Sequence, residues 1–123
     1  MKYLCLAYYD ERKFDAMADA DRDALVRKCP PLDADLRATG QLAMVASLAR
    51  TAASVAVRPV NGRPLVTDGP FAETKEQLGS FFLIEARDLN DAVRVACKHP
   101  AAVLGAEVGW GIEIRPIEYF DQP

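Results

Sequence analysis

Two strand-like segments of this chain carry apolar side chains on both of their alternating faces. These segments run from Lys2 to Tyr9 and from Gly79 to Ala86. Alternate residues of a strand point to opposite sides of its sheet, so a strand that is apolar throughout must be covered on both sides. A chain of 123 residues is long enough for one core and too short for two comfortable domains. We therefore expect one domain, residues 1–123, with a sheet that is covered on both faces.

The first helix is predicted around residues 25–36, where apolar residues recur at steps of three and four. Acidic residues precede this stripe, as suits the positive end of a helix dipole, and Gly40 marks its end. Pro30 and Pro31 interrupt the stripe. Because each proline removes a backbone donor and crowds the preceding turn, the sequence predicts either a kink or two short helices in line.

The second helix is predicted to begin after Asp88, a residue type that commonly caps helix N-termini, and to stop at Pro100. Its expected inner face consists of Leu89, Ala92, Val93 and Ala96. His99 precedes the proline and is expected at the C-terminal end of this helix, where a cation suits the dipole.

The middle of the chain holds the signals of a β-hairpin. Asn61-Gly62 is a typical two-residue hairpin turn, so the segment from Arg63 to Thr67 should return antiparallel to the one before it. Residues 73–77 are expected to form a helical turn. Further short strands are predicted over residues 42–48, 54–60 and 111–119.

The order of strand, helix, several strands, helix and strand predicts an α+β fold. Its mainly antiparallel sheet should carry both main helices on one face, and the ferredoxin-like arrangement is the nearest familiar topology. The residues expected to face the helices are Leu4, Leu6, Phe82 and Ile84, and those expected on the opposite face are Tyr3, Cys5, Phe81 and Leu83. Two helices cannot cover both faces, so we expect a homodimer that packs sheet against sheet. The alternative is a monomer with long loops over the second face.

Charge and composition exclude several functional classes. The formal net charge of −3 and the absence of a basic run give no electrostatic footprint for nucleic acid or an anionic membrane surface. No stretch approaches the roughly 20 apolar residues that cross a membrane. The N-terminal segment lacks the long apolar region and cleavage site of a signal peptide, so we expect a cytoplasmic protein with reduced cysteines.

Metal and cofactor sites have little support in the sequence. One histidine and no paired cysteine spacing leave too few ligands for a zinc site. The glycines are scattered and form no phosphate-binding loop. We therefore expect neither a metal nor a cofactor.

The turn Asp68-Gly69-Pro70-Phe71 between two strands has a structural and a functional interpretation. An aspartate oxygen can accept nearby backbone hydrogen bonds, glycine permits positive φ and proline fixes φ, so these residues suit a turn, with the phenylalanine anchored in the core. A carboxylate at a strand end beside an apolar cleft is also a candidate general base or ligand contact.

The run from Val66 to Gly79, VTDGPFAETKEQLG, followed by Phe82-Leu83-Ile84, resembles the signature of the YCII-related, DGPF-domain family. The terminal strands are similar too, so the likeness covers nearly the whole chain. The resemblance implies a dimeric α/β-barrel built from ferredoxin-like protomers, in a family that is largely uncharacterised. It also implies a pocket with a His and Asp pair, and an association of some relatives with extracytoplasmic-function sigma factors.

Carried over to this chain, the resemblance makes Asp68 the candidate catalytic acid. The family's histidine belongs on the first helix, whereas the single histidine of this chain is His99, at the end of the second. The candidate ligand-binding residues are Tyr8, Tyr9, Phe71, Lys75 and His99. Structural alternatives exist for them, including aromatic packing of the tyrosines and a solvated position for the lysine.

Two functions remain open from the sequence. The first is a small-molecule-binding barrel dimer, or a cofactor-independent enzyme that uses Asp68 as acid or base. The second is a non-catalytic regulatory or protein-interaction module linked to extracytoplasmic-function sigma factor signalling. For the second, the acidic face of the first helix, with Asp19, Asp23 and Asp33, could dock a basic partner, although solvation alone explains those charges.

Overall fold

Four antiparallel strands form the sheet of this protein. The computed structural model describes all 123 residues, with β1 (Lys2–Tyr9) and β5 (Gln77–Glu85) in the centre of the sheet and β2 (Leu42–Ser47) and β6 (Gly111–Pro116) at its edges. Both β1 and β2 run antiparallel to β5, so they are parallel to each other with β5 between them. In the same way, β5 and β6 enclose β1. The order β2-β5-β1-β6 is that of two split βαβ units and is compatible with the predicted ferredoxin-like topology.

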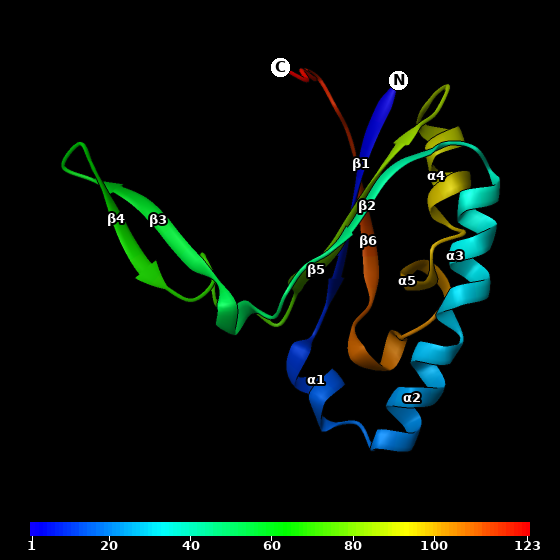
Figure 1. Cartoon of the computed structure of the whole chain (residues 1–123), viewed down its shortest axis with the longest axis horizontal. Helices are drawn as coiled ribbons and strands as arrows, with labels where there is room; N and C mark the ends of the chain where they lie inside the picture. The colour runs from blue at the N-terminus through cyan, green and yellow to red at the C-terminus, as the bar shows by residue number, and fades with distance from the viewer.

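Five short helices connect these strands. They are α1 (Glu11–Ala16), α2 (Asp19–Arg27), α3 (Cys29–Ala38), α4 (Leu89–Ala96) and α5 (Pro100–Val103), with 3-10 turns η1 (Thr51–Ala53) and η2 (Ala106–Val108). Figure 1 shows α3, α4 and α5 along one side of the sheet. Of the two predicted alternatives, two short helices in line are confirmed, as α2 and α3. Pro30 and Pro31 lie in the first turn of α3. The N–H groups of a first turn have no partner within the helix, so prolines are tolerated there. No helix combines the length and the apolar character needed to span a membrane.

The core lies between the sheet and helices α3 and α4. Strand β1 contributes Tyr3 and Cys5, and β5 contributes Phe82 and Ile84, all of them buried. The helices add Leu36, Ala92, Val95 and Ala96. The two pairs of strand residues share a face because the register aligns Tyr3 with Ile84 and Cys5 with Phe82. The predicted division of the β1 residues between the two faces is therefore wrong, since the register between strands decides which residues lie together.

Helix α4 turns a partly different side to the sheet from the one predicted. Asp88 caps its N-terminus as expected and accepts a hydrogen bond from the Asp91 N–H at 2.8 Å. Of the four residues predicted to face inwards, Leu89 and Val93 are instead 50% and 42% exposed. Asp91 and Val95 are buried in their stead. A carboxylate can occupy this position because the backbone N–H of Arg87 and the guanidinium of Arg94 donate to it.

No helical turn forms over residues 73–77, which corrects the prediction for that segment. The side chain of Gln77 donates instead to the backbone carbonyls of Thr74, at 2.9 Å, and Ala72, at 3.4 Å. Side-chain bonds to the backbone of this kind compete with helix formation. Strand β5 begins directly at Gln77.

A β-hairpin stands apart from the sheet. Its strands, β3 (Val55–Val60) and β4 (Arg63–Asp68), pair only with each other. Asn61-Gly62 forms the predicted turn, and both residues have positive φ, 52° and 75°, as a type I′ turn requires. We call residues 55–68 the arm. Figure 1 shows that the arm projects away from the sheet on the side opposite to the helices.

One face of the arm is apolar. The register places Val57 opposite Val66 and Pro59 opposite Pro64, and Val55 lies on the same face opposite Asp68, the one charged residue of this face, at the base of the arm. The other face mixes apolar and polar side chains, namely those of Ala56, Arg58, Val60, Arg63, Leu65 and Thr67. Val57 and Val66 are 56% and 60% exposed, so nothing within one chain covers the apolar face of the arm.

No helix covers the second face of the sheet. It carries Leu4 and Leu6 from β1, Phe81 and Leu83 from β5, and Met44 from β2, together with the charged Glu113 and Arg115 from β6. We call this surface the open face. The two central strands, β1 and β5, are thus apolar on both faces, as the sequence predicts, while the β6 edge of the open face is charged. Because β2 and β6 have no partner on their outer sides, one chain forms an open sheet and no closed barrel.

Candidate functional site

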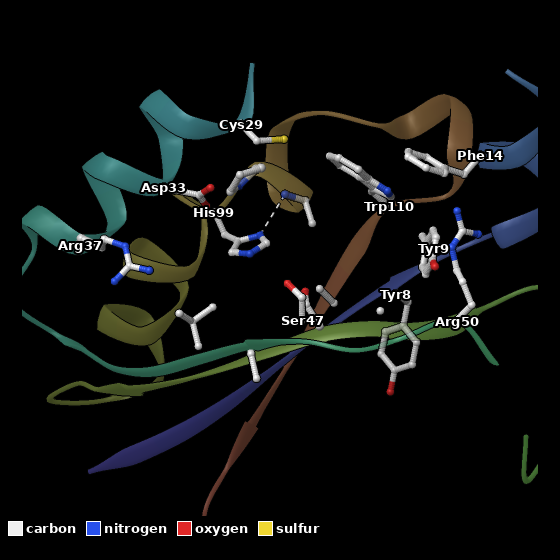
Figure 2. A pocket seen from close by; sticks show the side chains of 17 residues that line it. Tyr8, Tyr9, Phe14, Cys29, Asp33, Arg37, Ser47, Arg50, His99 and Trp110 are labelled. Atoms are coloured by element: carbon white, nitrogen blue, oxygen red, sulfur yellow. Dashed lines mark hydrogen bonds between the residues drawn. The ribbon is translucent and has the colours of Figure 1, made fainter. Parts of the chain in front are cut away.

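A cavity of about 480 Å³ opens between the helix-covered face of the sheet and helices α3 and α5. This volume falls in the range of small-molecule sites. The polar and aromatic side chains among its lining residues are Tyr9, Phe14, Asp33, Arg37, Ser47, Arg50, His99 and Trp110. Figure 2 shows the side chains of His99, Ser47 and Trp110 around a common space.

His99 lies between α4 and α5 and caps the second of these helices. Its Nδ1 accepts a hydrogen bond from the Ala101 N–H at 3.0 Å, and Pro100 follows it as the first helical residue. The prediction that His99 ends α4 as a cation is therefore wrong. An imidazole that accepts at Nδ1 is neutral and carries its proton on Nε2.

The imidazole of His99 rests on the ring of Phe82. The ring centroids are 4.7 Å apart and the planes differ by 6°, so the two rings are stacked. Burial lowers the pKa of His99 from its ordinary value, and the nearby carboxylate of Asp33 opposes this shift only in part. Stacking, burial and the Ala101 bond thus hold one uncharged tautomer in one orientation.

We expect His99 to titrate in the folded protein with a midpoint below 6.5, the ordinary value for histidine. Below pH 6.5 the unfolded chain then binds more protons than the folded one. The contribution of His99 to stability is therefore complete above that pH and is lost as the pH falls towards the folded pKa. NMR of the imidazole measures the midpoint without ambiguity, because the chain has one histidine. A midpoint at or above 6.5 would contradict the buried, neutral state.

Helix α3 supplies the charged side of the cavity. Asp33 and Arg37 are one helical turn apart, so both side chains point to the same side of α3. Figure 2 shows the Asp33 carboxyl beside His99. Cys29 lies one turn earlier on the same helix. Burial, with a smaller effect of Asp33, raises the pKa of the Cys29 thiol, so this cysteine is no activated nucleophile.

The opposite wall of the cavity is built around Arg50. Its guanidinium forms an ion pair with Asp15 at 2.8 Å and lies over the rings of Tyr9 and Phe14, 5.8 and 5.4 Å from their centroids. Glu11 fixes the loop that carries Arg50, because its carboxylate accepts hydrogen bonds from the backbone and hydroxyl of the next residue, Thr51. These contacts join α1 to the end of β2.

Trp110 closes the cavity between these two walls. Its backbone N–H donates to the carbonyl of Gly105 at 3.0 Å, which brings the indole ring against that glycine. Gly105 has a φ of 73°, and a Cβ atom there would overlap the indole ring. The position therefore needs a residue that tolerates the left-handed region and has no side chain.

The model of the YCII-related domain matches residues 1–119. The chain belongs to the YCII-related domain family. A relative from Rhizobium meliloti (strain 1021), described as the uncharacterized protein R00369, is 36% identical over 96 residues, which cover 78% of this chain and 77% of that protein.

The structure of this YCII-related chain brings together only some of the candidate site residues. His99 and Tyr9 line the cavity. Tyr8 is among the residues that line the cavity. Its hydroxyl, however, donates to Glu113 at 3.3 Å and points away from the cavity in Figure 2. Phe71 and Lys75 are exposed and outside the cavity, so their predicted ligand contacts stay predictions.

Asp68 does not reach the cavity within one chain. It is the last residue of β4, exposed at the base of the arm and opposite Val55. The expectation that Phe71 anchors this turn in the core is wrong, because the ring is 64% exposed and the Arg58 guanidinium covers it at 3.7 Å from the centroid. In this YCII-related chain the carboxylate nearest to His99 in the cavity is that of Asp33.

Sequence reasoning missed the charged residues of this cavity. Asp33 was assigned to a solvated helix face, and Arg37, Ser47 and Arg50 had no assigned role. The spacing of Cys29, Asp33 and Arg37 at steps of four was the available signal, since it places all three on one side of a helix. This spacing predicts a polar stripe on the helix. It does not predict that the stripe faces His99, which lies 66 positions after Asp33 in the chain.

A shallow second hollow surrounds Asp91, Gln41 and Arg87. Hydrogen bonds from the Arg87 backbone N–H and the Arg94 guanidinium hold the pKa of Asp91 well below its usual range. All of these partners belong to the chain, so this carboxylate joins α4 to the edge of the sheet. Nowhere in the chain do three or more His, Cys, Asp or Glu side chains lie together as a metal site requires.

Proposed function

We propose that this YCII-related protein binds a small molecule carrying an acidic group, in the cavity beside His99. One observation carries the proposal: the imidazole lines a cavity of ligand size, and the Ala101 N–H occupies its Nδ1. That leaves Nε2, with its proton, as a fixed donor for a ligand.

The charges around the cavity support an acidic ligand. Two arginines, Arg37 and Arg50, and one carboxylate, that of Asp33, line it. The Arg50 guanidinium is already paired with Asp15, whereas Arg37 has no ion pair within the chain and is the arginine left for a ligand. Arginine binds carboxylates with two parallel hydrogen bonds, and a neutral imidazole donates to an anion without repelling it. The aromatic walls of Trp110 and Tyr9 would pack against the rest of the ligand.

Cofactor-independent acid–base catalysis is the second candidate function. With Nδ1 occupied by the Ala101 N–H, His99 can donate its Nε2 proton to a reacting group, and the carboxylate of Asp33, which lies close enough to His99 to act on its pKa, is the candidate base. Asp68 as acid or base stays a proposal. It lies on the same face of the arm as Val57, so it would have to act from a second copy of the chain.

We also propose that the protein is a homodimer in which two open faces pack together to complete a barrel. The support is the apolar character of the open face, which no helix covers. Apolar side chains on a sheet face without a covering helix are typical of an interface between subunits.

Two substitutions of His99 separate ligand binding from helix capping. His99→Asn keeps a cap for α5, because asparagine is among the best N-cap residues, but it removes the Nε2 donor. His99→Ala removes both. With benzoate as probe and the fluorescence of the single tryptophan, Trp110, as readout, we expect both variants to bind at least about tenfold more weakly than the native protein. Only His99→Ala should also lose about 1 kcal/mol of stability.

Benzamide is the matched neutral probe for this experiment. We expect it to bind more weakly than benzoate, and Arg37→Gln to reduce the difference. If His99→Asn binds benzoate as the native protein does, His99 only caps α5 and the proposed site is wrong. If benzamide binds as well as benzoate, the cavity has no preference for an acidic group.

A further inference from the structure

We propose that the arm is an intersubunit strap, and that its apolar face packs against a second copy of this chain. The contact involves Val55, Val57, Pro59, Pro64 and Val66. This inference goes beyond the proposed barrel dimer, because that dimer requires only the open faces. It is also independent of the ligand in the cavity.

The position of the arm favours contact with the partner that covers the open face. An exposed hairpin with one apolar face keeps its long side chains in water unless another surface covers them. The arm leaves the sheet on the side opposite to the helices, which is the side of the open face (Figure 1). A single partner that covers the open face therefore also meets the arm. By two-fold symmetry, each copy receives the arm of the other.

The number of residues that a stable interface needs also favours contact through the arm. The strands of the sheet have six to nine residues, and alternate residues face outwards, so the open face presents roughly a dozen side chains. A stable interface of standard size uses about 20–30 residues from each partner. The open face alone falls short of this range. Six of the twelve strand residues of the arm lie on its apolar face, and they bring the total close to the lower end of this range.

The charge of the arm also favours a second copy of the chain as its partner. The arm carries two arginines, Arg58 and Arg63, and one acidic residue, Asp68 at its base, so it has a net positive charge in a chain with a net charge of −3. A basic projection on an acidic protein finds complementary charge on another copy of the same protein. A second copy thus satisfies both the apolar and the charged side of the arm.

Charged substitutions on the two faces of the arm test this proposal. The double variant Val57→Asp/Val66→Asp places carboxylates on the apolar face, and Leu65→Asp places one on the other face as the matched control. We expect the double variant to raise the dissociation constant of the dimer at least about 100-fold, and the control less than about tenfold. Analytical ultracentrifugation measures both. Circular dichroism should stay unchanged, because the arm lies outside the core.

A second measurement locates the arm directly. In a mixture of isotope-labelled and unlabelled chains, isotope-filtered NMR should show contacts from the methyl groups of Val57 and Val66 to the other copy. Dissociation by the double variant, together with these contacts, supports the strap. Dissociation by Leu65→Asp alone would show that the other face binds, and the proposal as stated would be wrong.

A variant of the open face, Met44→Asp, distinguishes the strap from the barrel dimer. If Met44→Asp dissociates the dimer and the double arm variant does not, the barrel proposal stands and the strap is overturned. A native chain that is monomeric at micromolar concentration overturns both. An arm that binds a different protein, such as a sigma factor, while the dimer stays intact without it also overturns the strap. Benzoate binding is measured separately, so its failure has no bearing on this result.

Discussion

Replacement of Phe82 by alanine is expected to lower the free energy of unfolding by about 3–5 kcal/mol. The phenylalanine ring is fully buried in the core between the sheet and helices α3 and α4. Its loss leaves a cavity that neighbouring side chains fill only in part. Small domains have a total stability of about 5–15 kcal/mol, so the variant should be marginally folded. Urea denaturation followed by circular dichroism measures the change.

Phe71→Ala is the control, because this phenylalanine is exposed and stacks only beneath Arg58. We expect it to cost about 0.5–1 kcal/mol. Phe82→Leu should stay folded but alter the NMR signal of His99, since the stacked ring is lost. Equal losses for Phe82→Ala and Phe71→Ala would contradict the described core, and an unchanged histidine signal in Phe82→Leu would contradict the stacking.

Gly105→Ala is expected to lower the stability by about 2–5 kcal/mol and to displace the indole ring of Trp110. Two effects add at this position: the strain of a left-handed backbone and the overlap of the new Cβ with the indole. Because Trp110 is the only tryptophan, its emission should shift as the ring leaves the cavity wall. Benzoate binding should weaken together with this shift.

Gly109→Ala has the first of these effects, the backbone strain, without the second. Gly109 has the same φ of 73° as Gly105, but its nearest neighbours, atoms of Asp10, lie 3.5 Å from the position of a Cβ. This control should lose only the backbone term of about 1–2 kcal/mol and keep the native emission of Trp110. If the two variants have the same stability and emission, the contact between Gly105 and the indole ring is not as described.

Much of the fold could be predicted because its signals are local. The Asn61-Gly62 turn, the Asp88 cap and the prolines at the start of α3 each depend on a few adjacent residues. The faces of β1 were misassigned because the pairing of Tyr3 with Ile84 joins residues 81 positions apart. Likewise, α4 buries Asp91 because Gln41 and the Arg87 backbone N–H, both outside this helix, donate to the carboxylate in addition to Arg94.

The candidate site was harder to predict for the same reason. His99 was recognised as the only histidine, but its role as the cap of α5 follows from one hydrogen bond to Ala101. Asp33 and Arg37 resemble any charged pair on a solvated helix until the tertiary fold brings them to the cavity. The motif around Asp68 identified the family, whereas the cavity lies elsewhere in the chain.

The two prolines that face each other in the arm reduce the tendency of this lone hairpin to add further strands. A lone hairpin exposes main-chain N–H groups along both outer edges, where further strands can add and start aggregation. Beside a two-residue turn, Val60 and Arg63 exchange hydrogen bonds, so the N–H groups of the next pair would point outwards. Pro59 and Pro64 occupy that pair and have no N–H to offer. Each outer edge of the hairpin therefore lacks an N–H donor at its proline. This makes the uncovered hairpin a poorer template for the addition of further strands.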